Sequence, residues 1–422
     1  MKMTKNNSAV MADTTSDLWE KMNKLTVGEC FFQIRNGANI KQGVADGGFP
    51  ITRIETIAND RFNRDRMGYA GITDADKYQS YILEDGDLLM SHINSVQYLG
   101  RTVLYHKQEN EKIIHGMNLL AMKANRDILN PAYAQYYFRS IPFREQIRQI
   151  TKKSVNQASF TVSDLKKIPM QVPSLLEQCN AVETLDRVNK LLELHQHQLQ
   201  KLDELIKARF VEMFGDPVGN TKAYYVATLQ ELICKGYITY HLDGNHGSDY
   251  PKSDEFVEAG TPYISANCIV NGEVDFSKAK YLTLERANKL RKGIAQNEDV
   301  LFAHNATVGP TVVLHTTKEK VILGTSLTAY RCNKEKILPN YLKSYMLSDG
   351  FIRQYSNEMK QTTRNQVPIT AQKKYLFLIP PIGLQNQFAT FVNQVDKSKV
   401  AVQKSLDEAQ LLFDSLMQQY FE

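Results

Sequence analysis

Two short polar segments of similar composition occur in the two halves of the chain, KKSVNQ at Lys152–Gln157 and QTTRNQ at Gln361–Gln366. Each combines cationic, hydroxyl and amide side chains and ends in Asn-Gln. Donors of these three kinds, gathered on one loop, can hold phosphate oxygens. The Asn and Gln side chains can equally cap the backbone of a turn, so both interpretations stay open. The matched residues are Lys152, Lys153, Ser154, Asn156 and Gln157 in the first segment, and Thr362, Thr363, Arg364, Asn365 and Gln366 in the second.

Two other segments resemble catalytic or metal sites but lack an essential part. Asn130–Tyr133 (NPAY) is close to the Asn-Pro-Pro-Tyr site of amino-methyltransferases, but Ala132 replaces the second proline that aims the Asn. A helix start at Pro131 is the better interpretation. His241–His246 (HLDGNH) has two histidines, but no further ligand follows, which favours a solvated loop. No glycine-rich methyl-donor loop and no GxxxxGK motif occurs, so the sequence predicts no catalytic residue, no metal site and no cofactor in this chain.

The two polar segments belong to a longer internal repeat. Gly100–His106 (GRTVLYH) aligns with Gly309–His315 (GPTVVLH), and other matches keep the same order. These pairs are Pro50 and Pro262, Ile57 and Ile269, Asp87 and Asp299, Leu89 and Leu301, His92 and His304, Tyr133 and Tyr341, and Phe143 and Phe351. Each copy alternates short β-rich runs with polar turns, and a helix is expected after Pro131 or Pro339. The repeat therefore predicts two similar α+β domains.

A long amphipathic helix is expected after each copy. Ser174 and Glu177 form a capping-box pattern at the start of the first helix, and Gly215 is expected to end it. Apolar residues then recur at alternating steps of four and three, a narrow stripe that suits one partner helix. The seam residues are Leu185, Val188, Leu192, Leu199, Leu202 and Ile206 in the first helix, and Val392, Val395, Val402, Leu406, Phe413 and Leu416 in the second. His195 and Lys399 interrupt the two seams and are interpreted as solvent-edge or register positions.

The predicted order is therefore a lead segment (1–24), a first domain (25–173), a central helix (174–215), a second domain (216–383) and a terminal helix (384–422). The expected fold class is α+β, with two similar domains, a pseudo-two-fold internal repeat, and two long helices packed as an antiparallel coiled coil. At 1.5 Å per residue, each helix would span roughly 55 Å.

Composition narrows the class of protein. The chain is 42% hydrophobic and 23% charged, with a net charge of +5 that allows an anionic partner without requiring one. Five scattered cysteines form no CxxC pair, which favours a reduced, cytoplasmic protein without structural zinc. No apolar run approaches the length of a membrane span, and the N-terminal segment lacks the apolar stretch of a signal peptide.

The tandem arrangement resembles the specificity subunit of type I restriction–modification enzymes, over nearly the whole chain from about Leu25 to Tyr420. The motifs that carry the resemblance are GDLL at Gly86–Leu89, the P-x-Y helix starts, and the helix junctions VPSLLEQ and PPIGLQNQ. The second copy departs from the pattern, because Glu298 replaces the glycine before Asp299 and Gly383 replaces the serine cap. These departures concern a local turn and a cap.

The resemblance implies a role. In that family each domain is a target recognition domain that reads one half of a split DNA sequence. The paired helices act as a spacer and as the docking surface for two methyltransferase subunits, and a nuclease–translocase subunit joins them. The chain itself is expected to be non-catalytic, with double-stranded DNA and those subunits as partners. Methyl donor and ATP would bind only to the partner subunits.

If both copies bind one duplex, residues shared by the copies serve structure, phosphate contact or docking, and base readers lie where the copies differ. The divergent polar loops are 35–42, 59–66 and 94–97 in the first copy, and 239–252, 265–272 and 305–307 in the second. Arg suits guanine, and Asn or Gln suits adenine. The base-reading candidates are Arg35, Arg53, Arg61, Arg64, Arg66 and Gln97, then Tyr240, His241, Asn245, His246, Lys252, Asn267 and Asn305. His92 and His304, which match, are expected to be structural or to face phosphate.

Two other classes of function remain open from sequence. The chain could be a DNA methyltransferase or nuclease whose motifs are too degenerate to identify. It could also be a structural coiled-coil protein that binds no nucleic acid. Methylation by the purified chain alone would favour the first, and absence of salt-dependent retention on duplex DNA would favour the second.

Overall fold

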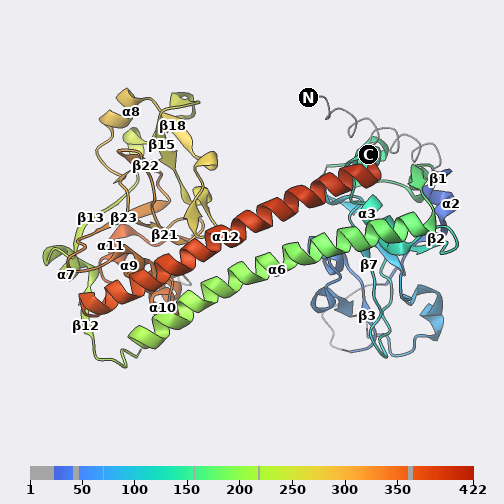
Figure 1. The fold of residues 1–422 in the computed structure, drawn as a ribbon, viewed down its shortest axis with the longest axis horizontal. Helices are drawn as coiled ribbons and strands as arrows, with labels where there is room; N and C mark the ends of the chain where they lie inside the picture. Colours follow the sequence, from blue (N-terminus) through green and yellow to red (C-terminus); the bar gives the residue numbers. More distant parts are fainter. Residues whose placement is uncertain (1–22, 41–46, 70, 156, 217–218, 360–364) are drawn as a thin grey trace, which may run out of the picture. The chain divides into compact units, whose positions relative to one another are not determined.

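The computed structural model describes residues 23–40, 47–69, 71–155, 157–216, 219–359 and 365–422 (Figure 1). The chain divides into two compact units, one comprising the chain up to Leu194 together with Ser405–Glu422, and the other comprising His195–Lys404. Both long helices contribute residues to both units. Within the described ranges, no helix has the length and apolar character needed to cross a membrane.

The first unit is built on a four-stranded antiparallel sheet. Its strand order is β2 (Phe31–Asn36), β8 (Leu119–Ala124), β5 (Leu88–Ser91) and β7 (Thr102–Leu104). Alternate residues of β5 enter different clusters, because successive strand residues point to opposite faces. Leu88 and Met90 pack in the main core, and Leu89 packs in a second cluster with Ile57. Both faces of the central strand are therefore buried, which explains its unbroken apolar run.

The second unit repeats this sheet. The order is β13 (Ile238–Asp243), β23 (Leu327–Cys332), β20 (Val300–Ala303) and β21 (Thr311–Val313). The pairing register matches as well: Leu89 lies opposite Ala121 and Val103, and Leu301 lies opposite Ala329 and Val312. The structure thus confirms the internal repeat and the two similar α+β domains.

The turn before the central strand is also the same in both units, despite the missing glycine. Gly86 adopts φ +85°, and Glu298 adopts φ +69° at the equivalent position. The carboxylate of Asp87 accepts a hydrogen bond from the Glu84 amide (2.9 Å), and that of Asp299 accepts one from the Gln296 amide (2.8 Å). The aspartate side chain therefore closes the turn in each unit, and Glu298 tolerates the left-handed conformation that glycine adopts freely.

Two helices follow each sheet, and a smaller two-stranded sheet closes each unit. The helices are α3 (Pro131–Tyr137) and α4 (Ile141–Ile150) in the first unit, and α9 (Pro339–Met346) and α10 (Asp349–Met359) in the second. The closing pairs are β1 (Asn23–Thr26) with β11 (Pro169–Val172), and β12 (Tyr225–Thr228) with β24 (Leu376–Ile379). The P-x-Y tyrosines serve the same purpose in both, since the Tyr133 hydroxyl donates to the Gln171 carbonyl (3.5 Å) and the Tyr341 hydroxyl donates to the Leu378 carbonyl (2.7 Å).

The long helices are α6 (Leu175–Phe214) and α12 (Ile382–Phe421). The expected capping box is present, because the Ser174 amide donates to the Glu177 carboxylate at 2.9 Å and the Glu177 amide donates to the Ser174 hydroxyl at 3.4 Å. Gly215 follows α6 with φ +76°, the conformation that ends helices.

The two long helices pack together and run antiparallel. In the first unit, Ala181 and Leu185 near the start of α6 share a core with Phe421 at the end of α12. In the second unit, the end of α6 meets the start of α12, where the rings of Phe214 and Phe388 lie 5.4 Å apart. Six of the seam residues are buried, and the others are half-buried: Leu185, Val188, Leu192, Val392, Val395 and Val402, then Leu199, Leu202, Ile206, Leu406, Phe413 and Leu416. Lys399, which interrupts the seam, pairs with Asp203 of the facing helix.

One buried glutamine begins each long helix. Gln178 accepts a hydrogen bond from the Asn130 amide (2.7 Å) and donates to the carbonyls of Ile128 and Pro173 (both 2.8 Å). Gln385 repeats this arrangement with the Leu338 amide (2.9 Å) and the carbonyls of Lys336 (3.3 Å) and Pro380 (2.9 Å). Both glutamines are fully buried, so each amide joins the helix start, the preceding strand end and the α3 or α9 helix start.

We expect Gln385→Met to destabilise the second unit by about 3 kcal/mol, because it leaves a buried amide and two carbonyls without partners. The measurement is thermal and urea unfolding followed by circular dichroism. Gln387→Met is the matched control, since Gln387 lies on the same helix and is exposed. Equal stability of the two variants would contradict a structural role for Gln385.

Candidate nucleic-acid interface

The first copied polar segment forms a β-hairpin. Strand β9 (Lys152–Lys153) pairs with β10 (Ala158–Ser159), which pairs in turn with β6 (Ile93–Asn94). The Ser154 amide and hydroxyl both donate to the Gln157 carbonyl, at 2.8 and 2.9 Å. Lys152, Lys153, Ser154 and Gln157 are exposed, and Asn156 lies outside the described residues. The hairpin thus displays two cations beside a strand end without using their side chains in its own turn.

The second copy lies at the equivalent place. Thr362, Thr363 and Arg364 fall outside the described residues. Gln366 bridges Asn305, and the Asn365 carbonyl accepts from the Ala306 amide at 3.0 Å. In both units the next segment is anchored to the matched histidine: the His92 carbonyl accepts from Phe160 (3.2 Å), and the His304 carbonyl accepts from Val367 (2.8 Å).

The copied segments therefore lie directly beside divergent loops. Loop 94–97 follows β6 in the first unit, and loop 305–307 contacts Asn365 and Gln366 in the second. The matched histidines are buried at the base of this region, and burial lowers the pKa of His92 to about 4 and lowers that of His304. Burial favours the neutral imidazole in both units, which supports a structural role for the two histidines.

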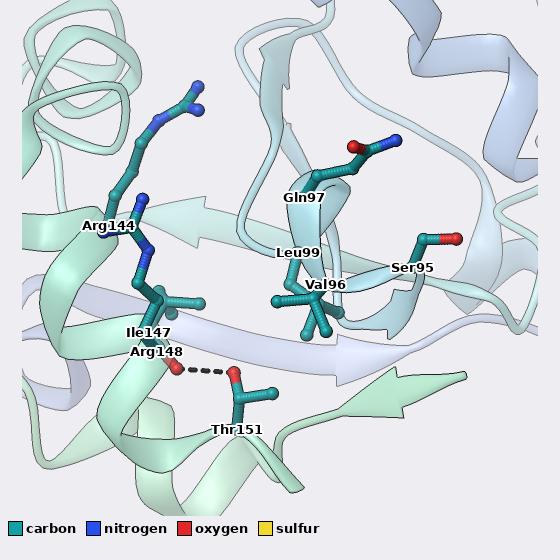
Figure 2. Close-up of a pocket in the computed structure, with 8 residues that line it drawn as sticks. All are labelled: Ser95, Val96, Gln97, Leu99, Arg144, Ile147, Arg148 and Thr151. Carbon is teal, nitrogen blue, oxygen red and sulfur yellow. Dashed lines mark hydrogen bonds between the residues drawn. The ribbon is translucent and has the colours of Figure 1, made fainter. Parts of the chain in front are cut away.

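A hollow of about 560 Å³ opens beside the first hairpin (Figure 2). It is lined by Ser95, Val96, Gln97, Leu99, Arg144, Ile147, Arg148 and Thr151. Gln97 lies on the short helix η4 (Val96–Tyr98), and the two arginines lie on α4. The candidate base reader Gln97 is thus grouped with two cations that the sequence analysis did not select.

The other first-copy candidates differ in how far their side chains are already engaged. Arg64 makes two hydrogen bonds to Glu111 (2.8 and 2.9 Å) and one to the His106 carbonyl (2.8 Å). Arg64 also holds the pKa of the Glu111 carboxyl at about 2, well below its ordinary value. Arg61 is exposed and pairs with Glu193 at 2.8 Å. The hydrogen bonds of Arg64 fix loop 59–66 to the segment 106–111, so this guanidinium is already engaged within the domain.

The structure corrects the predicted start of the loop 35–42. The segment 35–42 was expected to be a loop, but Arg35 and Asn36 belong to β2, and Arg35 lies opposite Ala121. Its guanidinium stacks over the Tyr81 ring at 4.2 Å. Residues 41–46 lie outside the described ranges. Arg53 is half-buried at the start of helix η1 (Ile54–Asp60), and Arg66 is exposed.

Three second-copy candidates are part of the fold. His241 is buried, and its Nε2 lies 3.1 Å from the Gln372 side-chain oxygen. Asn245 is 2% exposed and donates to the Lys292 carbonyl at 2.7 Å. The Tyr240 hydroxyl accepts from the Ile294 amide at 3.0 Å. The loop predicted from Thr239 begins inside β13, which places these polar groups in the sheet and its packing.

The remaining second-copy candidates are accessible. His246, Lys252 and Asn267 are exposed, and Asn305 is half-buried. His246 contacts Asp243 at 2.8 Å, and Asn267 accepts from the Ser265 hydroxyl at 2.6 Å. In the described part of the chain, no group of His, Cys, Asp or Glu side chains has the arrangement of a metal site.

Arg144 and Arg148 are not among the residues predicted from the sequence, because those candidates come from divergent loops and these two arginines lie on a helix. A signal was present in the repeat itself. Counting on from the matched Phe143 and Phe351, Arg144 aligns with Ile352 and Arg148 aligns with Ser356. The two copies therefore differ in charge along this helix, which is the criterion applied to the loops.

Known proteins are similar to this chain over most of its length. Residues 20–204 and 244–409 match the sequence model of the type I restriction modification DNA specificity domain. A relative from Methanocaldococcus jannaschii, provisionally named type I restriction enzyme MjaX specificity subunit, is 29% identical over 323 residues, covering 75% of this chain and 73% of that protein. A type I restriction-modification system S subunit from M. genitalium matches with a TM-score of 0.54 at 15% identity, covering 100% of this chain and 98% of that one.

A second solved structure, described under complex assembly and conformational transition of the type I R-M system, matches with a TM-score of 0.53 at 16% identity. The match covers 95% of this chain and 98% of that one. At these identities the two solved structures establish a shared fold.

We expect Asn245→Ala to lower the free energy of unfolding by about 1 kcal/mol without changing the DNA sequence that is recognised, because it removes the hydrogen bond from the buried Asn245 amide to the Lys292 carbonyl. Asn267→Ala, at an exposed amide of the same unit, is the control for stability. Thermal unfolding and mapping of the recognised sequence check the two parts. Relaxed recognition with unchanged stability would restore Asn245 as a base reader.

Buried histidines predict loss of stability in mild acid. Burial lowers the pKa of His92, His115 and His241 to about 4, whereas an unfolded histidine titrates near pH 6.5. The unfolded chain therefore binds more protons between about pH 6.5 and 4, and stability falls as the pH drops through that window, by about 3 kcal/mol per histidine. Unfolding temperature measured from pH 7 to pH 4 tests this. His241→Gln should weaken the dependence of the unfolding temperature on pH, and an unchanged dependence would contradict the contribution of His241.

Proposed function

The chain belongs to the type I restriction modification DNA specificity family, and from this membership we propose how its parts divide the work of DNA recognition. The chain is the DNA-recognition subunit of a restriction–modification complex. Each of the two domains, residues 25–173 and 216–383, reads one half of a bipartite DNA target. The long helices act as a spacer between the readers and as a docking surface for two methyltransferase subunits, and nuclease–translocase subunits complete the complex.

The observation that carries this proposal is the contrast between a shared framework and different exposed side chains. The sheets have the same strand order and register, and the buried glutamines make equivalent bonds. The surfaces beside the copied segments differ, with Gln97, Arg144 and Arg148 in the first unit and Asn305 in the second. Two readers of one duplex need a common backbone frame and separate base contacts, which is the pattern observed.

We further propose that this chain performs no chemistry. The specificity family is generally non-catalytic, and the Asn130–Tyr133 segment supports that assignment. The Asn130 side chain caps its own helix by accepting from the Ala132 amide at 2.9 Å, so it is used structurally. Methyl donor and ATP would then bind to the partner subunits, in the cytoplasm where the DNA is. A degenerate methyltransferase or nuclease is the less favoured alternative.

Co-expression with a methyltransferase subunit of the same host should produce adenine methylation at a gapped, two-part sequence, detected by mapping modified bases across the genome. The same methyltransferase without this chain is the control and should leave that sequence unmodified. The purified chain, incubated with duplex DNA and radiolabelled methyl donor, should transfer no label. Methyl transfer by the chain alone would support the alternative, and an ungapped motif would contradict the division into two readers.

A further inference from the structure

We propose that the hollow between α4 and η4 is a DNA contact of the first domain that the second domain lacks. Arg144 and Arg148 bind phosphates of one DNA strand, and Gln97 on the facing wall reads the edge of a nearby base. This inference rests on the proposed function and adds to it a specific set of residues, two of which lie on a helix rather than on a recognition loop.

The fold brings these three side chains together on a fixed support. Arg144 and Arg148 are four positions apart on α4, so they project from the same face. Figure 2 shows them on one side of the hollow, with Gln97 and Ser95 on the other. Ile147 of α4 packs against Gly100, since a Cβ added at Gly100 would lie 3.2 Å from its Cγ1. Gly100, at φ +74°, thereby lets the end of the loop approach α4 closely.

The electrostatics of the hollow favour an anion. Its lining includes two guanidinium groups and no carboxylate. Both arginines are exposed, and neither forms an ion pair with a carboxylate among the described residues. Arg61 and Arg64, by contrast, are each held by a glutamate of the same unit. Like charges one helical turn apart repel each other, so an arrangement of this kind gains from a bound anion.

The cationic surface continues from the hollow into the copied hairpin. Thr151 lines the hollow, and its hydroxyl donates to the Ile147 carbonyl at 2.6 Å (Figure 2). Lys152 and Lys153 follow at once in β9, and both are exposed. A succession of cations along one edge is what a DNA backbone requires, since each bound phosphate releases a counterion. The hollow and the hairpin therefore form one contact surface.

The second unit retains the support, but among its described residues the two positions equivalent to Arg144 and Arg148 are uncharged. Gly309 approaches Tyr355 as Gly100 approaches Ile147, with an added Cβ 2.9 Å from the Tyr355 hydroxyl. Ile352 and Ser356 occupy the positions of the two arginines. The loop that leads to this glycine is also shorter in the second unit. Gly309 follows Ala303 by six positions, whereas in the first unit Gly100 follows Ser91, the counterpart of Ala303, by nine. The extra residues of the first loop include η4 and Gln97.

The test uses the chain assembled with methyltransferase subunits and duplexes that carry the mapped target or single-base changes of it. We expect Arg144→Ala/Arg148→Ala to weaken binding to all these duplexes alike and to reduce the salt slope of log K by roughly 1 per arginine. Arg144→Lys/Arg148→Lys should keep the slope. Gln97→Ala should reduce discrimination at one base pair of one half-site by roughly 5- to 150-fold, the range for loss of a bidentate base contact.

Two control variants show whether the effect is specific to these arginines and to this position in the first unit. Arg126→Ala removes an exposed arginine beside Asp85, at the opposite end of the sheet, and Ser356→Ala alters the counterpart of Arg148 in the second unit. Neither should change the salt slope, and thermal unfolding should show that all variants fold.

The possible outcomes distinguish a failure of this inference from a failure of the proposed function. A wild-type complex that methylates a gapped sequence while the double alanine variant keeps its salt slope would overturn this inference and leave the proposed function standing. Relaxation at a defined base pair by the arginine variants would overturn their assignment to phosphate, and unchanged discrimination by Gln97→Ala would overturn its base contact. Absence of a two-part sequence for the wild type would refute the proposed function itself.

Discussion

The buried glutamine at the start of each long helix is the constraint on which the rest of the molecule depends. A primary amide has two donors and one acceptor in a plane, and Gln178 and Gln385 use all three on backbone groups. A fully buried amide that left one of them unpaired would be costly, so helix start, strand end and neighbouring helix keep one arrangement. Since the partners are backbone atoms, the side chains around the junction are free to change.

That freedom explains how two unlike domains can carry equivalent helices. The capping serine is present at Ser174 and absent from the second junction, yet both helices begin at the same place relative to their glutamine. The turn before the central strand shows the same tolerance, because Asp87 and Asp299 close it whether glycine or Glu298 precedes them. Backbone-directed polar bonds thus conserve the framework while the exposed loops diverge.

Sequence reasoning recovered the framework because its signals are local or periodic. Several local patterns locate helices and repeated positions to within a few residues. They are the prolines at helix starts, the capping box at Ser174, the spacing of the seam residues and the histidine that recurs in both copies. The candidate site was harder to predict because the fate of a polar side chain depends on distant partners. Arg64 binds Glu111, and Asn245 binds the Lys292 carbonyl; in each case the partner lies 47 residues away in the sequence. No periodic pattern in the sequence predicts such contacts. The strand β2 was also difficult to predict, because apolar and polar residues do not alternate regularly in its sequence FFQIRN.

Divergence between the copies is therefore a necessary signal for base readers and not a sufficient one. The second unit has diverged inside its core as well, where Gln372 joins the His241 ring, the Tyr330 hydroxyl and the Thr328 hydroxyl in one buried network. Differences of that kind adjust the packing inside the domain. Exposure and the absence of an intramolecular carboxylate partner must be added as filters, and together they remove Arg64, His241 and Asn245. The same filters retain Gln97 and admit Arg144 and Arg148, beside a hairpin whose position is the same in both domains. Under the proposed function, base contact and phosphate contact share one rigid frame, so that a change of loop would change the target without moving the domain on the duplex.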